Sequence, residues 1–252
     1  MSNIKWHRSD SIGSTNTYLR ELGGGDPAYD YEVAVADFQT AGRGQKGNAW
    51  ESEQGKNLLF SILAHPKNIK VREQFYISES IALAVSDSVM AALGPQFARE
   101  VSVKWSNDVY WKEFKMAGIL IENTLQGDRI LDTVVGVGLD VNQEVFLSDA
   151  PNPISLKNIT GRDYDRDALL SDIVERFKGY MELQADKRSD VDKLYRYRLF
   201  RREGYHRFRD ALGEFEACIE GIHPDGCLML QTTGGEHRVY EFKQVQFILQ
   251  QN

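Results

Sequence analysis

The stretch from Val103 to Glu122, VKWSNDVYWKEFKMAGILIE, constrains the fold more than any other part of the chain. Apolar and polar residues alternate at its start, and Asn107 and Asp108 then supply turn residues before a second apolar segment begins. This pattern predicts a short hairpin followed by a further strand. Because successive side chains of a strand point to opposite faces, the ammonium of Lys115 is expected on the face that three apolar residues also occupy, namely Ala117, Ile119 and Ile121.

Two interpretations of this lysine are open. A lysine at the end of a strand ordinarily extends its stem until the ammonium reaches water, and Asn-Asp is also an ordinary turn. A functional site is the alternative, because four polar residues crowd into an otherwise apolar sheet: Lys104, Asn107, Asp108 and Lys115. Two cations and a carboxylate able to hold Mg2+ would suit the phosphates of a nucleotide.

A group of small polar side chains lies near the N-terminus. After a first strand, the spacing of apolar residues over 18–22 predicts a helix that ends at the glycines 23–25. Ser14, Thr15 and Asn16 would lie at the start of this helix. Capping of the helix explains them as well as binding of a small polar ligand does, since hydroxyl and amide groups offer both donors and acceptors.

A glycine-rich segment follows the strand predicted over residues 32–39. Gly42 to Gly47 formally matches the dinucleotide-binding pattern GxGxxG, but no helical periodicity follows it, and the region about 20 residues further on is basic instead of acidic. We therefore reject that fingerprint. Glycines with Arg43 and Lys46 instead predict a cationic segment whose backbone amides can approach phosphate oxygens, or a solvated surface loop. Trp50 either stacks on a base or closes the core.

The remaining segments read as a scaffold. Gly136 and Gly138 lie inside an apolar strand, where a glycine indicates a close approach of backbone or ligand, or else a bulge. Residues 142–161 read mostly as loop, and from about residue 202 the pattern changes to short strands separated by turns. Periodicity predicts helices over 73–93, 169–181 and 190–199, and strands over 4–12, 57–65 and 130–141.

These elements predict an α+β fold in two parts. Residues 1–200 are expected to form a mixed central sheet flanked by helices, and residues 201–252 a small antiparallel β-barrel. At 252 residues the chain is long enough to bury one large core and one small one.

Charge and composition exclude several classes of protein. The net charge of −7 argues against a general nucleic-acid binder, which needs a basic face. No apolar run approaches the roughly 18 residues of a membrane span, and the start of the chain lacks the apolar core of a signal peptide, so a cytoplasmic location without membrane attachment is expected. Cys218 and Cys227 would not face each other in their hairpin and are read as reduced thiols, and five scattered histidines give no zinc-site signal.

Five segments occur in an order and spacing that span most of the first 145 residues: Ser14 to Asn16, Gln39 to Gly44 with Gly47 and Trp50, Lys104 to Asp108, Lys115 to Glu122, and Gly136 to Leu139. Together they resemble the biotin protein ligases, the enzymes that attach biotin to carboxylases. The C-terminal region is similar in pattern to the SH3-like domain of that family.

The resemblance implies a fold and a reaction. A class II synthetase-like catalytic domain over residues 1–200 would precede an SH3-like domain over 201–252. Biotin and ATP, with Mg2+, would give biotinyl-5'-AMP and pyrophosphate, and a lysine of a biotin carboxyl carrier protein of acetyl-CoA carboxylase or a related carboxylase would then take the biotinyl group. A homodimer is left open. Because 13 residues precede Ser14, the DNA-binding domain of repressor-type members is not expected, nor is DNA as a partner.

The resemblance also implies roles for matched positions. Lys115, Arg43 and Asp108 would be catalytic, with Asp108 as a candidate Mg2+ ligand. Nucleotide contacts would come from Trp50, Asn107, Gly138, Leu139 and Asp140. Biotin contacts would come from Ser14, Thr15, Asn16, Gln39, Gly42, Arg43, Gly44, Gln45, Lys115, Gly118 and Gly136.

Two departures from the family pattern bear on these roles. Gln45 stands where many members have a second arginine, which implies looser retention of the intermediate, and Asp140 stands where the family usually has an asparagine, which leaves the nucleotide contact there open. Two other functions compete with the ligase. A lipoate or octanoate protein ligase shares the fold but lacks the Gly-Arg-Gly-x-x-Gly-x-x-Trp loop, and a non-catalytic biotin or nucleotide sensor would not turn over.

Overall fold

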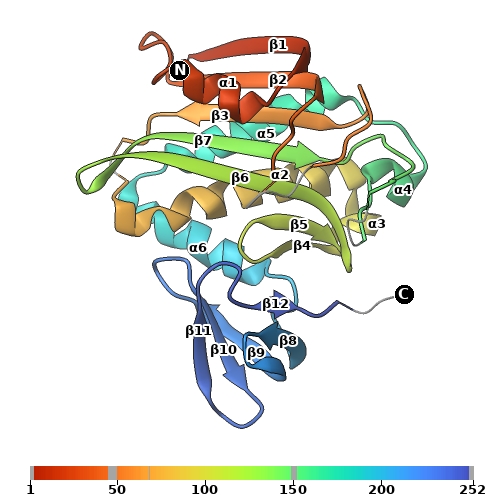
Figure 1. Cartoon of the computed structure of the whole chain (residues 1–252), viewed down its shortest axis with the longest axis vertical. Helices are drawn as coiled ribbons and strands as arrows, with labels where there is room; N and C mark the ends of the chain where they lie inside the picture. Colours follow the sequence, from red (N-terminus) through yellow and green to blue (C-terminus); the bar gives the residue numbers. More distant parts are fainter. Residues whose placement is uncertain (1–2, 45–49, 68, 149–151, 250–252) are drawn as a thin grey trace.

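A computed structural model describes residues 3–44, 50–67, 69–148 and 152–249 of the chain. A seven-stranded sheet runs in the order β1-β2-β3-β7-β6-β5-β4, and a separate five-stranded sheet lies at the C-terminal end (Figure 1). β1 and β2 pair in parallel and the other neighbours pair antiparallel, so the large sheet is mixed as predicted. Its strands are β1 (Ile4–Ile12), β2 (Tyr31–Gln39), β3 (Leu58–Ala64), β4 (Val101–Lys104), β5 (Asp108–Trp111), β6 (Phe114–Gln126) and β7 (Arg129–Leu139).

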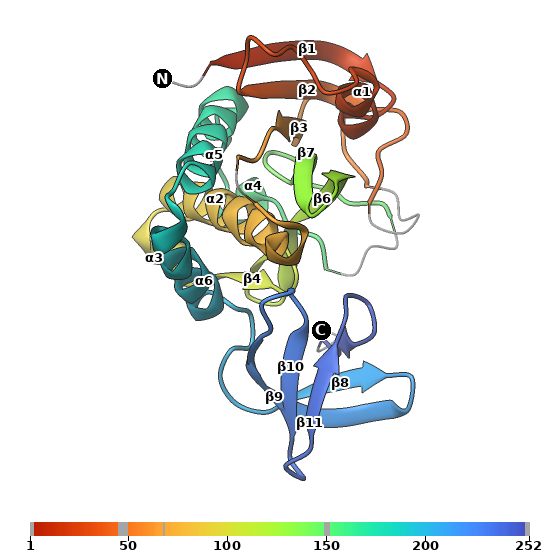
Figure 2. The ribbon, with the colours of Figure 1, turned by 90° about the vertical axis from the view of Figure 1, so that its left-hand side faces the viewer.

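Helices cover the two faces of this sheet unequally. α2 (Phe75–Leu93), α5 (Arg166–Met181) and α6 (Arg188–Tyr197) lie on one side, whereas the short α1 (Thr15–Glu21) packs on the other, against β2, β3 and β7 (Figure 2). The short helices α3 (Pro95–Ala98) and α4 (Leu156–Thr160) complete this part of the chain, together with the 3-10 turns Val71–Glu73 and Ala185–Lys187. The face beside α1 is therefore the more open one.

The main core lies between the sheet and α2. Ile77, Ile81, Val85 and Val89 recur along one side of the helix and are each fully buried, as their spacing predicts. By length and hydropathy, the segment from Val71 to Leu93 could also cross a membrane. However, 72% of its apolar 18-residue window is buried inside the fold. This segment is the core helix.

A bulge on β6 overturns one prediction. Val109 of β5 pairs with Ala117, but the next residue, Tyr110, pairs with Lys115, so Met116 is an extra residue on β6. Met116 and Ala117 are both fully buried in the main core. The expectation that Lys115 shares a face with Ala117 is therefore wrong, because the inserted residue breaks the strict alternation and turns the lysine to the opposite face.

The C-terminal sheet is antiparallel throughout, in the order β11-β10-β9-β8-β12. Among the described residues its pairing does not close into a barrel, since β11 and β12 are its two edges. Both cysteines are free, as predicted. Trp105, which follows β4, joins the two sheets because its Nε1 donates a hydrogen bond to the carbonyl oxygen of Gly226 over 2.8 Å. The strands are β8 (His206–Asp210), β9 (Gly213–Ile222), β10 (Leu228–Thr232), β11 (His237–Tyr240) and β12 (Gln246–Phe247).

Candidate functional site

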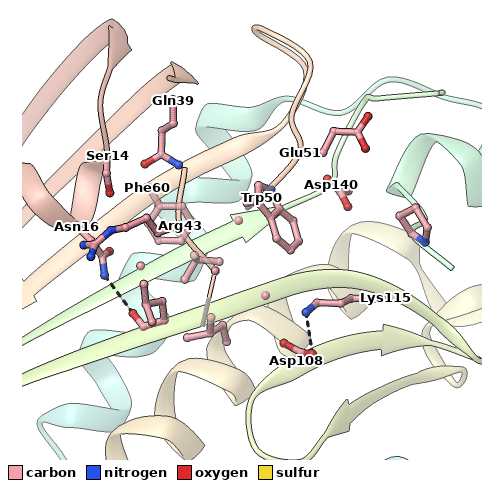
Figure 3. Close-up of a pocket in the computed structure, with 18 of the residues that line it drawn as sticks. Ser14, Asn16, Gln39, Arg43, Trp50, Glu51, Phe60, Asp108, Lys115 and Asp140 are labelled. Carbon is pink, nitrogen blue, oxygen red and sulfur yellow. Dashed lines mark hydrogen bonds and ion pairs between the residues drawn. The ribbon is translucent and has the colours of Figure 1, made fainter. Parts of the chain in front are cut away.

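A cavity of about 580 Å³ opens on the face of the large sheet that α2 does not cover (Figure 3). Most of the predicted site residues line it: Ser14, Thr15, Asn16, Gln39, Arg43, Gly44, Trp50, Lys104, Asp108, Lys115, Gly118, Gly136, Gly138 and Asp140. They come from five strands, helix α1 and connecting segments, so the fold assembles the site from separate motifs.

The end of the cavity beside α1 is neutral and rich in hydrogen-bonding groups. The backbone nitrogen of Thr15 donates to Gln39 Oε1 over 2.7 Å, and Thr15 Oγ1 lies 2.7 Å from Ser61 Oγ. Ser61 Oγ donates to Asn16 Oδ1 over 2.5 Å, and Ser14 Oγ accepts the N-capping bond from the nitrogen of Thr17. Residues 14–16 therefore begin the helix, as the capping interpretation predicts, and they also line the cavity.

Three glycines let other groups lie directly on the sheet. A Cβ atom on Gly136 would lie 2.0 Å from Asn16 Oδ1, and one on Gly138 would lie 2.5 Å from the indole of Trp50. Gly118, the partner of Gly138 on β6, would meet the same indole at 2.8 Å. The pairing of β7 is regular at these positions, so the glycines serve a close approach and mark no bulge.

The opposite end of the cavity is charged. Lys115 Nζ lies 2.7 Å from Asp108 Oδ2 and 5.7 Å from the centre of a Trp50 ring (Figure 3). Lys104 lies on the same wall, with its Nζ 5.2 Å from the ring of Tyr110 and 5.3 Å from the ring of Phe247. Burial lowers the pKa of Lys104, although Asp108 opposes the shift. The crowding that the sequence predicts is confirmed for these three charged groups.

Arg43 borders the neutral network on the side away from Lys115, so this end of the cavity also carries one guanidinium group (Figure 3). Its Nη2 donates to Thr17 Oγ1 over 3.1 Å and to Glu122 Oε2 over 3.3 Å. Glu122 also accepts from Arg20 and from Asn16 Nδ2. Because 44% of the arginine side chain is exposed, its ion pair is a weak restraint that a bound anion could replace.

Some predicted contacts lie elsewhere. Asn107 and Leu139 are buried and do not belong to the cavity wall that the described residues form, and Asn107 Nδ2 donates to the carbonyl oxygen of Ile119 over 3.3 Å. Gly42 packs beside Gln39 and the backbone of Trp50, just behind that wall. Gln45 is outside the described residues.

Comparison with known proteins identifies the family. Residues 9–140, more than half of the chain, match the sequence model of the biotin/lipoate A/B protein ligase family. The chain belongs to this family. It is 29% identical over 237 residues to the bifunctional ligase/repressor BirA of Bacillus spizizenii, covering 92% of this chain and 70% of that protein. A biotin-[acetyl-CoA-carboxylase] ligase of Mycobacterium tuberculosis is 31% identical over 176 residues, which are 69% of this chain and 64% of that protein.

Solved structures of biotin protein ligases share the fold. The ligase of Aquifex aeolicus in complex with biotin and ATP superposes with a TM-score of 0.77 at 24% identity, covering 99% of this chain and 100% of that one. The likeness extends over both sheets, so the C-terminal sheet of this ligase-family chain corresponds to part of that fold.

Sequence reasoning missed several residues of the cavity. Phe60 comes from the middle of a strand that reads as purely structural, and Glu51 follows Trp50 directly. Ser61, next to Phe60, is fully buried and holds the wall residues Thr15 and Asn16 by hydrogen bonds. Phe242 and Lys243 reach the cavity from the turn between β11 and β12. No signal in the sequence marks them, apart from the neighbourhood of Glu51 to Trp50.

The described residues hold no cluster of three or more side chains able to ligate a metal. Asp108 is available as one carboxylate, but Lys115 already pairs with it. Mg2+ at nucleotide sites is commonly held by one or two carboxylates together with substrate phosphates. The residues therefore fit an ion that arrives with a nucleotide and do not form a cage for a resident one.

Proposed function

We propose that this chain is an ATP-dependent biotin protein ligase. Family membership and the chemistry of the cavity support this function together. A neutral network of donors and acceptors lies at one end of the cavity and the Lys115 ammonium at the other. The strands β6 and β7, which carry the three glycines, lie between them. Biotin has the matching arrangement, with a neutral ureido ring at one end and a carboxylate at the end of an apolar chain.

The neutral end suits the ureido ring. Asn16 and Gln39 are held in place by Ser61 and Thr15, so their side chains are oriented before a ligand arrives. Preorganised neutral groups bind an uncharged polar ring without the desolvation cost of a buried ion. Ser14, Thr15, Asn16 and Gln39 would thus contact the ring, while Gly136 leaves room for the Asn16 side chain to lie against β7.

The charged end suits activation of the carboxylate. Attack of a biotin carboxylate oxygen on the α-phosphorus of ATP brings two anions together, which cations must offset as pyrophosphate leaves. Lys115 would exchange Asp108 for the biotin carboxylate, and Arg43 would leave Glu122 for the phosphates. Mg2+ bound with ATP would supply further charge neutralisation next to Asp108.

Transfer to the carrier would use the groups that activation leaves free. The amine of the acceptor lysine attacks the carbonyl carbon of biotinyl-5'-AMP, AMP leaves, and the nitrogen gives up a proton. Asp108, once Lys115 holds the ligand, offers a carboxylate that can orient this amine or accept its proton.

The nucleotide would lie over the remaining wall. Trp50, Gly138 and Asp140 line it directly. Asn107 and Leu139 would act from behind it, because Asn107 supports the backbone of β6 and Leu139 is part of the main core. The indole N–H of Trp50 is buried with no partner among the described residues and could donate to a ligand.

We also propose a protein partner, a location and domain boundaries for this chain. The protein partner would be the biotin carboxyl carrier domain of acetyl-CoA carboxylase or a related enzyme, and the site would work in the cytoplasm. We take residues 1–200 as the catalytic domain and 201–252 as an SH3-like domain whose turn at Phe242 and Lys243 adds to the cavity. A homodimer is compatible with this assignment.

Calorimetric titration of biotin, with and without a non-hydrolysable ATP analogue, tests the assignment. Tight biotin binding that couples to the nucleotide supports a biotin ligase, and binding of lipoate in its place supports the lipoate branch of the family. Release of pyrophosphate on mixing biotin with ATP distinguishes the enzyme from a sensor. Binding of neither acid would overturn the proposed function.

A further inference from the structure

Asp140 follows directly on the last residue of β7, and its carboxyl group forms part of the cavity wall (Figure 3). The residue is 3% exposed. Within the described chain, one hydrogen bond reaches its side chain, from Asn57 Nδ2 to Asp140 Oδ1 over 3.0 Å. The second oxygen, Oδ2, is left to the cavity.

The charged groups around Asp140 do not neutralise it. Lys115 on β6 is the cation that faces it, but this ammonium is paired with Asp108 at 2.7 Å. Glu51, from the segment before β3, adds a second negative charge. The cations on the helices packed nearby are engaged elsewhere, since Lys157 of α4 pairs with Glu144 and Asp163, and Arg166 of α5 pairs with Asp37.

A carboxylate in this position would lack what buried carboxylates need. A buried charge is tolerated when it is paired and fully hydrogen-bonded, and a single amide N–H does not meet that condition. Burial therefore raises the pKa of Asp140 well above its ordinary range; Lys115 opposes the shift and Glu51 adds to it. The neutral acid avoids the cost of the buried charge.

We infer that Asp140 works as a neutral carboxylic acid whose proton lies on Oδ2 and points into the cavity as a hydrogen-bond donor to the nucleotide. This inference rests on the proposed function. Because Oδ1 accepts from Asn57, Oδ2 is the oxygen free to carry the proton. A neutral acid presents one donor and one acceptor, as a side-chain amide does, whereas an ionised carboxylate has acceptors alone and repels phosphate. Burial thus gives this aspartate the hydrogen-bonding pattern of a side-chain amide.

The pH dependence of nucleotide binding tests the inference. Affinity for a non-hydrolysable ATP analogue is measured from about pH 6 to about pH 9, a range in which an ordinary aspartate is already ionised. Wild-type protein is expected to lose about tenfold in affinity as Asp140 ionises. This is the effect of replacing one charge-assisted hydrogen bond to the nucleotide by a repulsion between the carboxylate and the nucleotide. Asp140→Asn, which cannot ionise, is expected to vary much less with pH and to bind more tightly than wild type at the alkaline end.

A second measurement reports the proton itself. In protein labelled with 13C at the aspartate carboxyl carbons, the resonance absent from Asp140→Asn belongs to Asp140, and its shift at pH 7 should be that of a protonated acid. Titration of that resonance at the ordinary pH of an aspartate would overturn the inference. So would parallel pH profiles of nucleotide binding in the two proteins, with the proposed function intact. Absence of nucleotide and biotin binding in both proteins at every pH would instead remove the proposed function, and the role of Asp140 with it.

Discussion

Lys115 Nζ and Asp108 Oδ2 lie 2.7 Å apart at the charged end of the cavity, and each side chain is about 30% exposed. The two strands that carry them are neighbours, and the bulge at Met116 brings the lysine to the cavity face. The pair gives the site a cation that is held in position and can still exchange its partner, because a partly exposed ion pair is worth little.

Replacement of Lys115 by alanine should abolish most of the activation step. Loss of one preorganised cation at the reacting carboxylate predicts a fall of about 100-fold or more in the rate of biotinyl-5'-AMP formation. Pyrophosphate release measures this rate. Lys193→Ala is the matched control, because Lys193 is an exposed lysine on α6 paired with Asp190. Equal rates in the two variants would contradict the role given to Lys115.

Replacement of Asp108 by asparagine should separate the two half-reactions. With its partner neutral, Lys115 is freer to bind a carboxylate, so biotin affinity is expected to rise about two- to fivefold. Transfer to the carrier should become slower, since the group that receives the acceptor lysine is lost. Calorimetry with biotin and single-turnover transfer from preformed biotinyl-5'-AMP measure the two effects. Weaker biotin binding together with normal transfer would exclude this assignment.

A methyl group on Gly138 should displace the indole of Trp50, because the new Cβ would lie 2.5 Å from the ring. Overpacking of this kind predicts a loss of about tenfold or more in nucleotide affinity for Gly138→Ala. Gly179→Ala is the control, because nothing lies within 4 Å of a Cβ at Gly179. Tryptophan fluorescence and titration of an ATP analogue provide the measurement, and unchanged affinity in Gly138→Ala would show that the indole does not form the nucleotide wall.

Glu79 on α2 should make stability depend on pH. Burial and then the neighbouring Asp192 raise its pKa to about 8, from an ordinary value of 4.5. Its stabilising contribution is therefore complete below about pH 4.5, where both states bind the proton, and is lost as the pH rises toward about 8, because the unfolded state ionises first. Compared with wild type, Glu79→Gln should lose less stability over that window, by up to about 1.4 kcal/mol per pH unit.

Urea unfolding of wild type and Glu79→Gln at several pH values measures this difference. The glutamine keeps a group that can donate to Asp192, so the variant removes the ionisation with little change in shape. Parallel stability curves between pH 5 and pH 8 for the two proteins would mean that Glu79 is ionised in the folded state.

Local patterns in the sequence were sufficient for the elements and for most of the chemical groups of the site. The spacing of Ile77, Ile81, Val85 and Val89 predicts the core helix, because helical periodicity is a property of neighbouring residues. Gly136 and Gly138 indicate a close approach or a bulge from their strand context, and the structure shows the close approach. The motifs around Ser14, Arg43, Trp50 and Lys115 carry the resemblance to the ligase family, and the family comparison confirms it.

The order of residues along the chain dictates which elements form and which polar groups are available, whereas folding dictates where those groups point and how far each is removed from water. A single inserted residue, Met116, sends Lys115 to the cavity face, and no local pattern reveals it because a bulge depends on how two strands pair. Lys243 reaches the cavity, and Ser61 supports Asn16 at its wall, from segments far from any motif. Asp140 carries its proton because burial removes water and the nearest cation is already paired, and both conditions exist in the folded chain alone.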